Sequence, residues 1–134
     1  MTRLPVLALL IVAGCDTLGF GSGNDGLVCT LEFRSIGVEV VDGDGAPVAG
    51  LDAETVIVET GERLDRSASV DGGQGGVYVV ASDAHVERLD EDGTALRFTA
   101  SGDTLTASAE FVIAGGPCHV SKLSGPDQIV ARPR

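Results

Sequence analysis

Few side chains in this sequence are of the types that carry out chemistry. They comprise three cysteines, at positions 15, 29 and 118, the two histidines His85 and His119, and two short acidic clusters. A cysteine thiol can be acylated, oxidised or bound to a metal, and a histidine can transfer protons or bind a metal. Carboxylates at alternate positions can hold calcium. The surroundings of each residue decide among these chemistries.

Neither histidine lies in a pattern typical of catalysis. The chain has no G-x-S-x-G turn and no H-E-x-x-H pair, so a hydrolytic triad and a zinc site lack their usual sequence signals. His85, in SDAHVERL, is expected in an exposed loop. His119 follows Cys118 with no second cysteine to complete a haem-attachment motif, and is expected at a strand edge or on the surface. We therefore predict no catalytic residue and no cofactor, and keep an undetected hydrolase as the less favoured alternative.

The acidic clusters are weak candidates for a calcium site. They contain Asp42 and Asp44 in VDGDGAPVAG, and Asp90, Glu91 and Asp92 in LDEDGT. An EF-hand loop needs a bidentate Glu six residues after its glycine, but Leu51 occupies that position relative to Gly45. The favoured interpretation is solvated turns, the first of them a hairpin-type loop. Binding of calcium or a small ligand by the acidic loops is the alternative.

Length and composition predict one folded domain that does not bind nucleic acid. The chain has 134 residues, of which 43% are apolar, and its formal net charge is −11. A surface with this charge repels nucleic acids and anionic lipid headgroups. The sequence has no Trp, one Tyr and four Phe, too few aromatic rings for a platform on which bases or sugars stack.

From residue 31 onward, apolar residues alternate with polar ones in short runs separated by Gly, Asp and Pro, which predicts an all-β fold. The expected strands are 35–41, 55–60, 76–82, 94–101, 105–113, 119–123 and 128–131, with one turn of helix possible at 84–89. The side chains expected to face the core are Ile36, Val38 and Val40; Val56 and Val58; Val77, Val79 and Ala81; Leu96, Phe98 and Ala100; and Leu105, Ala107, Ala109, Phe111 and Ile113. About seven strands in this length predict a β-sandwich.

The first fifteen residues have the organisation of a secretory signal. A positive start at residues 1–3 precedes about ten apolar residues, a run too short to span a bilayer. The run ends in Val12-Ala13-Gly14-Cys15, which resembles the lipobox of bacterial lipoproteins. That resemblance implies cleavage of a signal peptide, residues 1–14, and attachment of a diacylglycerol group to Cys15.

Lipidation of Cys15 would leave Cys29 and Cys118 as a disulfide pair, in keeping with the oxidising compartment that an export signal implies. Residues 15–28 comprise the lipidated cysteine and a glycine-rich stretch that predicts a flexible tether with a reach on the order of 20 Å. Residues 29–134 are then the β-sandwich domain. The tether is expected to hold this domain close to a membrane.

A second resemblance concerns the domain itself. The segment VEVVDGDGAPVAG, residues 38–50, is similar to the start of carboxypeptidase-regulatory-like domains. GVYVV, residues 76–80, and the closing segment 111–131 are similar to later parts of such domains in small bacterial lipoproteins. The resemblance implies a transthyretin-like (prealbumin-like) sandwich of about seven strands. The chain lacks a zinc-peptidase segment and the Tyr-Arg-Gly-Ser ending of the related hydroxyisourate hydrolases.

Domains of this kind mostly act as stabilising, adhesive or interaction modules. The resulting expectation is a lipoprotein of the bacterial cell envelope, attached to a membrane through the lipid on Cys15. It would lie on the periplasmic face of the inner or outer membrane, or on the cell surface. Its domain would be a non-catalytic binding or structural module, with an envelope protein or a wall polymer as its partner.

Overall fold

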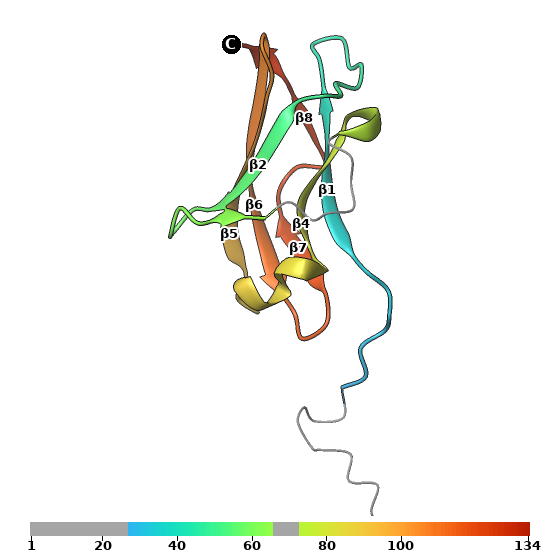
Figure 1. The fold of residues 1–134 in the computed structure, drawn as a ribbon, viewed down its shortest axis with the longest axis vertical. Coiled ribbons are helices and arrows are strands. Elements are labelled where there is room, and N and C mark those ends of the chain that lie inside the picture. The colour runs from blue at the N-terminus through green and yellow to red at the C-terminus, as the bar shows by residue number, and fades with distance from the viewer. Residues whose placement is uncertain (1–26, 66–72) are drawn as a thin grey trace, which may run out of the picture.

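The structure, a computed structural model, describes residues 27–65 and 73–134. Over this part the chain forms a sandwich of two β-sheets with almost no helix (Figure 1), which confirms the predicted all-β fold. The predicted signal peptide, the lipidation of Cys15 and most of the tether fall on residues 1–26 and lie outside the described residues.

Nine strands and two 3-10 segments make up the described part of the chain. The strands are β1 (Ser35–Val41), β2 (Asp52–Ile57), β3 (Arg63–Leu64), β4 (Val77–Ser82), β5 (Thr94–Ser101), β6 (Leu105–Gly115), β7 (Val120–Ser124), β8 (Gln128–Val130) and β9 (Arg132–Pro133). The 3-10 segments are η1 (Gln74–Gly76) and η2 (Asp83–Arg88). One sheet has the order β4-β1-β8; the other has the order β3-β2-β5-β6-β7, with β9 also paired to β6.

The hairpin of β5 and β6 forms the centre of the larger sheet, and its alternation agrees with the sequence. Leu96, Phe98 and Ala100 are completely buried, while Arg97 faces solvent opposite Glu110 and lies 3.0 Å from it. On β6, Phe111 and Ile113 are buried on the same side. A side-chain period of two directs one face of the hairpin to the core and the other to water.

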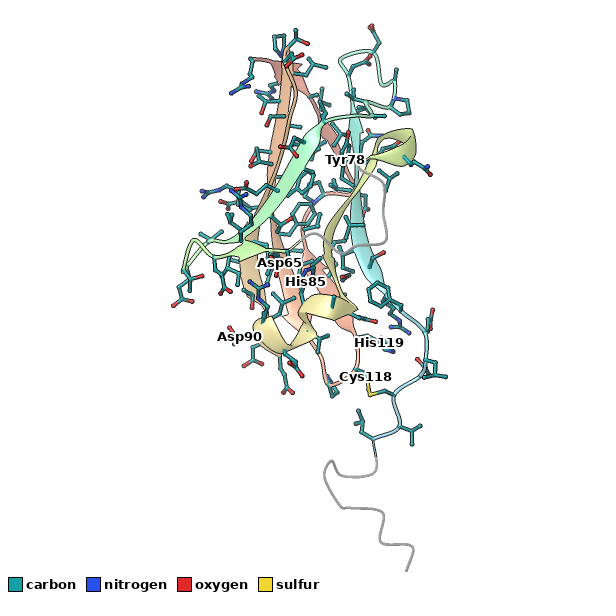
Figure 2. All side chains as sticks on the ribbon, in the orientation of Figure 1. Asp65, Tyr78, His85, Asp90, Cys118 and His119 are labelled. Carbon is teal, nitrogen blue, oxygen red and sulfur yellow. A yellow bond between two sulfur atoms is a disulfide. The ribbon has the colours of Figure 1, made fainter. Side chains whose placement is uncertain are left out.

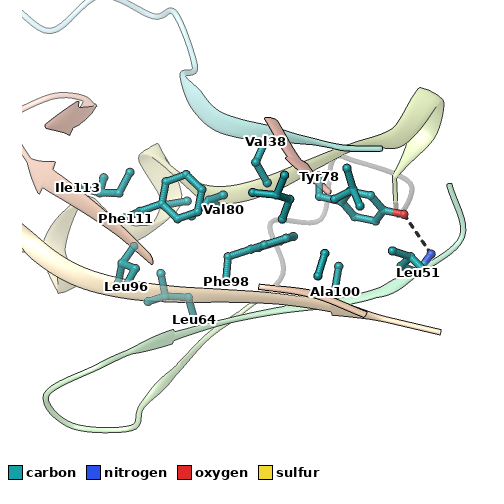
Figure 3. Packing of buried hydrophobic residues seen from close by; sticks show 14 of the residues in the cluster. Val38, Leu51, Leu64, Tyr78, Val80, Leu96, Phe98, Ala100, Phe111 and Ile113 are labelled. Atoms are coloured by element: carbon teal, nitrogen blue, oxygen red, sulfur yellow. Dashed lines mark hydrogen bonds between the residues drawn. The ribbon is translucent and has the colours of Figure 1, made fainter. Parts of the chain in front are cut away.

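The core lies between the two sheets and centres on three aromatic rings (Figure 3). Tyr78 from the smaller sheet faces Phe98 from the larger one, with ring centroids 6.2 Å apart and planes tilted by 52°. Phe111 packs further along, beside Leu96 and Val80. Tilted rings at this separation have a favourable electrostatic geometry in addition to the apolar area they bury.

The predicted core-facing side of β2 was wrong. Thr55 and Ile57 are buried, whereas Val58 is exposed and Val56 only half-buried. The run Thr55 to Val58 contains three successive β-branched apolar residues, so its own alternation does not define a face. The strand begins earlier than predicted, at Asp52, and its first residues set the phase. The buried Leu51 precedes it, and the polar residues Asp52 and Glu54 are exposed.

The predicted core-facing side of β4 was also wrong at two of three positions. Tyr78 and Val80 are buried, while Val77 is exposed and Val79 is half-buried. The pairing with β1 shifts by one residue between Ile36, opposite Ala81, and Gly37, opposite Val79. This β-bulge changes the phase of β4, so that Ala81 is buried as predicted although Val79 is not.

The segment 42–50 folds back on the end of β1 as a hairpin-type loop does, with the N–H of Asp42 bonded to the carbonyl of Ala46 and the N–H of Val48 bonded to the carbonyl of Val40, and it then crosses to the other sheet. β1 and β2 do not pair: β1 belongs to the smaller sheet and β2 to the larger one. The turn closes locally through a bridge between Val41 and Pro47. The two short strands β3 and β9 were not predicted, because two residues are too few to show a period. The expected turn of helix at 84–89 corresponds to η2.

Candidate functional site

A group of polar side chains joins the N-terminal segment to the sandwich at the end where β1 begins. The Asp83 carboxylate, on η2, accepts three hydrogen bonds: Oδ2 from the backbone N–H of Arg34 at 2.7 Å and from Nδ1 of His119 at 2.6 Å, and Oδ1 from the backbone N–H of Val120 at 2.8 Å. Nε2 of His119 lies 3.0 Å from Oγ1 of Thr30. We call these five residues the Asp83 junction.

The junction surrounds the Asp83 carboxylate with hydrogen-bond donors and shields it from solvent. The Asp83 side chain is 10% exposed and that of His119 is 15% exposed. Burial raises the pKa of Asp83, but the hydrogen bonds from His119 and from the N–H groups of Arg34 and Val120, with the charge of His119, outweigh it. The net effect lowers the pKa of Asp83 below the ordinary value of an aspartic acid, because the folded structure stabilises the carboxylate.

The predicted disulfide lies next to the junction. Cys29 and Cys118 are bonded, with their Cα atoms 5.4 Å apart and 89 positions apart in the sequence, which confirms the pairing. Figure 2 shows Cys118 and His119 beside the segment that leads to β1. The bond and the junction together attach residues 29–34 to η2 and to the start of β7. The N-terminal segment therefore leaves the sandwich from one defined end.

Thr30, His119 and Asp83 have the order of a hydroxyl, imidazole and carboxylate relay. In the neutral imidazole that donates Nδ1–H to Asp83, Nε2 accepts the hydroxyl proton of Thr30. This is the arrangement that activates a hydroxyl as a nucleophile in acyl transfer. The same contacts also serve a structural purpose, because they connect three separate segments of the chain.

The expectation that His85 is an exposed loop residue was wrong. His85 is 4% exposed, and both of its ring nitrogens are engaged. Nδ1 accepts the backbone N–H of Ser82 at 3.0 Å, and Nε2–H donates to the carbonyl of Asp65 at 2.7 Å. A carbonyl only accepts, so the ring is the neutral tautomer with its proton on Nε2. Both nitrogens stabilise the fold, and neither is available to a substrate or a metal.

A cavity of about 370 Å³ opens between β4 and the strands β2 and β3, at one edge of the sandwich. Among the described residues, its wall includes Leu51, Tyr78, Val80 and His85, and its charged side chains are Asp52, Glu54, Asp65 and Arg63. Figure 2 shows Tyr78, His85 and Asp65 along this edge. The volume falls in the range of small-ligand pockets, roughly 300–1,000 Å³. Thr30, Asp83 and His119 do not line the cavity.

The weak calcium candidates do not come together. Asp42 Oδ1 accepts the backbone N–H groups of Asp44 and Ala46, both at 2.9 Å, so this carboxylate organises its own turn. The backbone of Asp90 closes the other turn, where its N–H donates to Oγ1 of Thr94 at 2.8 Å. Within residues 27–65 and 73–134, no three side chains of His, Cys, Asp or Glu are grouped so that they could hold a metal ion.

Sequence reasoning missed the roles of Thr30 and Asp83. One signal was available for Thr30: it follows Cys29 as His119 follows Cys118, so the disulfide brings the two residues close together. No such signal existed for Asp83, which lies 36 positions from His119. The position of Asp83 depends on η2, whose first turn follows a bulged strand.

Comparison of the chain with protein-family models, with curated proteins and with solved structures gave no match. Over the two described ranges, no helix is sufficiently long and apolar to cross a bilayer.

Proposed function

We propose that this chain is a lipid-anchored lipoprotein of the bacterial cell envelope whose β-sandwich acts as a non-catalytic binding or structural module. The observation that carries the proposal is the Cys29–Cys118 disulfide. It accounts for two of the three cysteines and leaves Cys15, the last residue of a lipobox-like sequence, for the lipid. A disulfide also agrees with export to an oxidising compartment.

The arrangement of the domain on its tether supports this role. Residues 29–34 are attached to the sandwich at the end formed by η2 and the start of β7. The C-terminus lies at the opposite end of the sandwich (Figure 1). Cys15 is only twelve residues from Leu27, so the anchored domain would keep the η2 end close to the membrane and present the other end to partners.

Two experiments test the anchor and the partner separately. The variant Cys15→Ala is expected to accumulate as an uncleaved, unacylated precursor. Mass spectrometry measures the mass of the variant, and a mass that shows normal cleavage would refute the lipobox assignment.

In intact cells, crosslinking of the native protein should capture a reproducible envelope protein or wall polymer that Cys15→Ala does not capture. Equal capture by both forms would argue against an anchored interaction module.

Binding of a small ligand is the second candidate function, and the cavity favours it. The cavity has the volume of a ligand pocket, and its described lining carries three carboxylates, of which Glu54 is paired with Arg63 at 2.6 Å and Asp65 with Arg88 at 3.5 Å. This acidic lining favours a small cationic ligand over an anionic one. Titration calorimetry and thermal shift with divalent ions and small organic cations would test this function. The variant Glu54→Gln should weaken such binding, and Glu110→Gln, on the exposed face of β6, should not.

Hydrolysis is the third candidate, favoured only by the relay of Thr30, His119 and Asp83. Profiling with ester and amide substrates, followed by the variants Thr30→Val and His119→Ala, tests it. His85→Ala is the informative comparison, since both nitrogens of His85 bond to the backbone. Activity that survives both junction variants would remove this relay from consideration.

A further inference from the structure

Within residues 27–65 and 73–134, most of the exposed apolar side chains that are close in sequence lie in the segment that leads to β1. The described residues include eight exposed large hydrophobic side chains, and four of them fall within residues 27–33: Leu27, Val28, Leu31 and Phe33, with exposures of 52%, 90%, 105% and 56%. The other four, Val58, Val77, Leu123 and Val130, belong to separate parts of the sandwich. Single exposed apolar residues are common, whereas four within seven consecutive residues concentrate apolar surface in one segment, which makes this segment a candidate contact surface.

The structure holds the part of this segment from Cys29 onward in place. Cys29 is bonded to Cys118, Thr30 contacts His119, and the backbone N–H of Arg34 donates to Asp83. Leu31 and Phe33 therefore lie between two attachment points, Thr30 and Arg34. Binding through these two side chains loses less conformational entropy than binding through a free tether would, because the backbone around them is already held.

The net charge of this segment is more compatible with a lipid bilayer than the net charge of the whole chain is. The chain as a whole carries a net charge of −11, which anionic lipid headgroups repel. The charged side chains within 27–34 are Glu32 and Arg34, which neutralise each other at a separation of 3.6 Å. A neutral, apolar segment can enter the headgroup region without the penalty that the other surfaces of this domain would meet.

We propose that Leu27, Val28, Leu31 and Phe33 form a membrane-contacting surface that inserts into the bilayer to which Cys15 is anchored. This inference rests on the proposed lipid anchor. The twelve residues from Cys15 to Leu27 hold the surface within reach of the lipid headgroups, on the order of 20 Å. The two acyl chains of the diacylglycerol group on Cys15 would anchor the chain, and burial of apolar side chains adds to the membrane affinity in proportion to their area. The contact would also fix the orientation of the sandwich on the membrane.

The absence of tryptophan from the sequence permits a direct test. The variants Leu31→Trp and Phe33→Trp each place one tryptophan in the surface, and Val130→Trp places one at the opposite end of β1, where β8 pairs with Val41. Val130 is 52% exposed, close to the exposure of Phe33. Each full-length, lipidated variant would be reconstituted into phosphatidylcholine vesicles with brominated acyl chains, after mass spectrometry has established the lipid on Cys15.

We expect tryptophan at positions 31 and 33 to shift its emission to the blue and to lose most of its intensity to the brominated chains, while tryptophan at position 130 keeps its emission. Quenching at 31 and 33 no greater than at 130 would overturn the inference while leaving the anchor intact. A blue shift without quenching would also overturn it, because a protein surface rather than lipid would then cover the segment. Absence of lipid from Cys15 would overturn the proposed function, and the inference with it.

Discussion

The carboxylate of Asp83 lies 2.6 Å from Nδ1 of His119, across 36 positions of sequence, and both residues are largely shielded from solvent. Through this contact and the two backbone N–H groups that Asp83 also binds, three segments are joined: the start of β1, η2 and the start of β7. The Cys29–Cys118 disulfide reinforces the same end. One end of the sandwich is therefore held by polar and covalent contacts, while apolar packing holds the middle.

The Asp83 junction predicts a specific loss of stability in acid. Because the folded pKa of Asp83 is lower than the unfolded pKa, the unfolded chain binds the proton first as the pH falls. The stabilisation is complete above the unfolded pKa and disappears as the pH falls through the folded pKa, that is, below about pH 4. Asp83→Asn should cost about 1.5–3 kcal/mol at neutral pH, and the difference from the native protein should narrow in acid.

Urea unfolding across this pH range, followed by the fluorescence of the single tyrosine, would measure the effect. Asp103→Asn is the matched control, because this carboxylate is exposed in the turn before β6. A difference between Asp83→Asn and the native protein that stays constant down to the acid transition would contradict the assignment.

The disulfide predicts a strong dependence on redox conditions. Cys29 and Cys118 close a loop of most of the domain, so the bond restricts the unfolded chain. Cys29→Ser/Cys118→Ser should lower the free energy of unfolding by about 2–4 kcal/mol. Thermal unfolding with and without a thiol reductant is the measurement. The reductant should destabilise the native protein and have no effect on the double variant; equal effects on both would show that the bond contributes little.

Removal of the Tyr78 hydroxyl is predicted to lower the stability of the fold. Tyr78 is 2% exposed, and its Oη donates to the carbonyl of Val48 at 2.8 Å and accepts the N–H of Leu51 at 3.1 Å. These bonds attach the β1–β2 connection to β4. Tyr78→Phe keeps the ring beside Phe98 but leaves both backbone groups without this partner, at a cost of about 1–3 kcal/mol. Far-UV circular dichroism during urea unfolding would show it, and a loss below about 0.5 kcal/mol would argue against these bonds.

The buried face of β2 predicts a large loss of stability on truncation of one apolar residue and a small change on truncation of the next. Ile57 is 6% exposed and Val58 is 41% exposed. Ile57→Ala should destabilise the fold by about 2–4 kcal/mol, because it leaves a cavity in the core. Val58→Ala should change stability by less than about 0.5 kcal/mol. Unfolding by guanidinium would compare the two variants, and a larger loss for Val58→Ala would reverse the assigned face.

The sequence by itself determined the fold class, the disulfide and the central hairpin. Regular alternation over residues 94–101 and 105–113 defined the buried face of β5 and β6, because each strand carries one apolar side for its whole length. Pairing of Cys29 with Cys118 followed from the number of cysteines once Cys15 was assigned to the lipid. Both results depend on patterns that are local or that involve few possibilities.

Only the tertiary structure decided the faces of β2 and β4 and the composition of the Asp83 junction. In β2, three consecutive β-branched residues fit either face, and the pairing with β5 selects one of them. In β4, a bulge against β1 changes the phase within the strand. Asp83 meets His119 because η2 and the start of β7 are packed at the same end of the sandwich, a contact between distant segments that no local pattern of residues encodes.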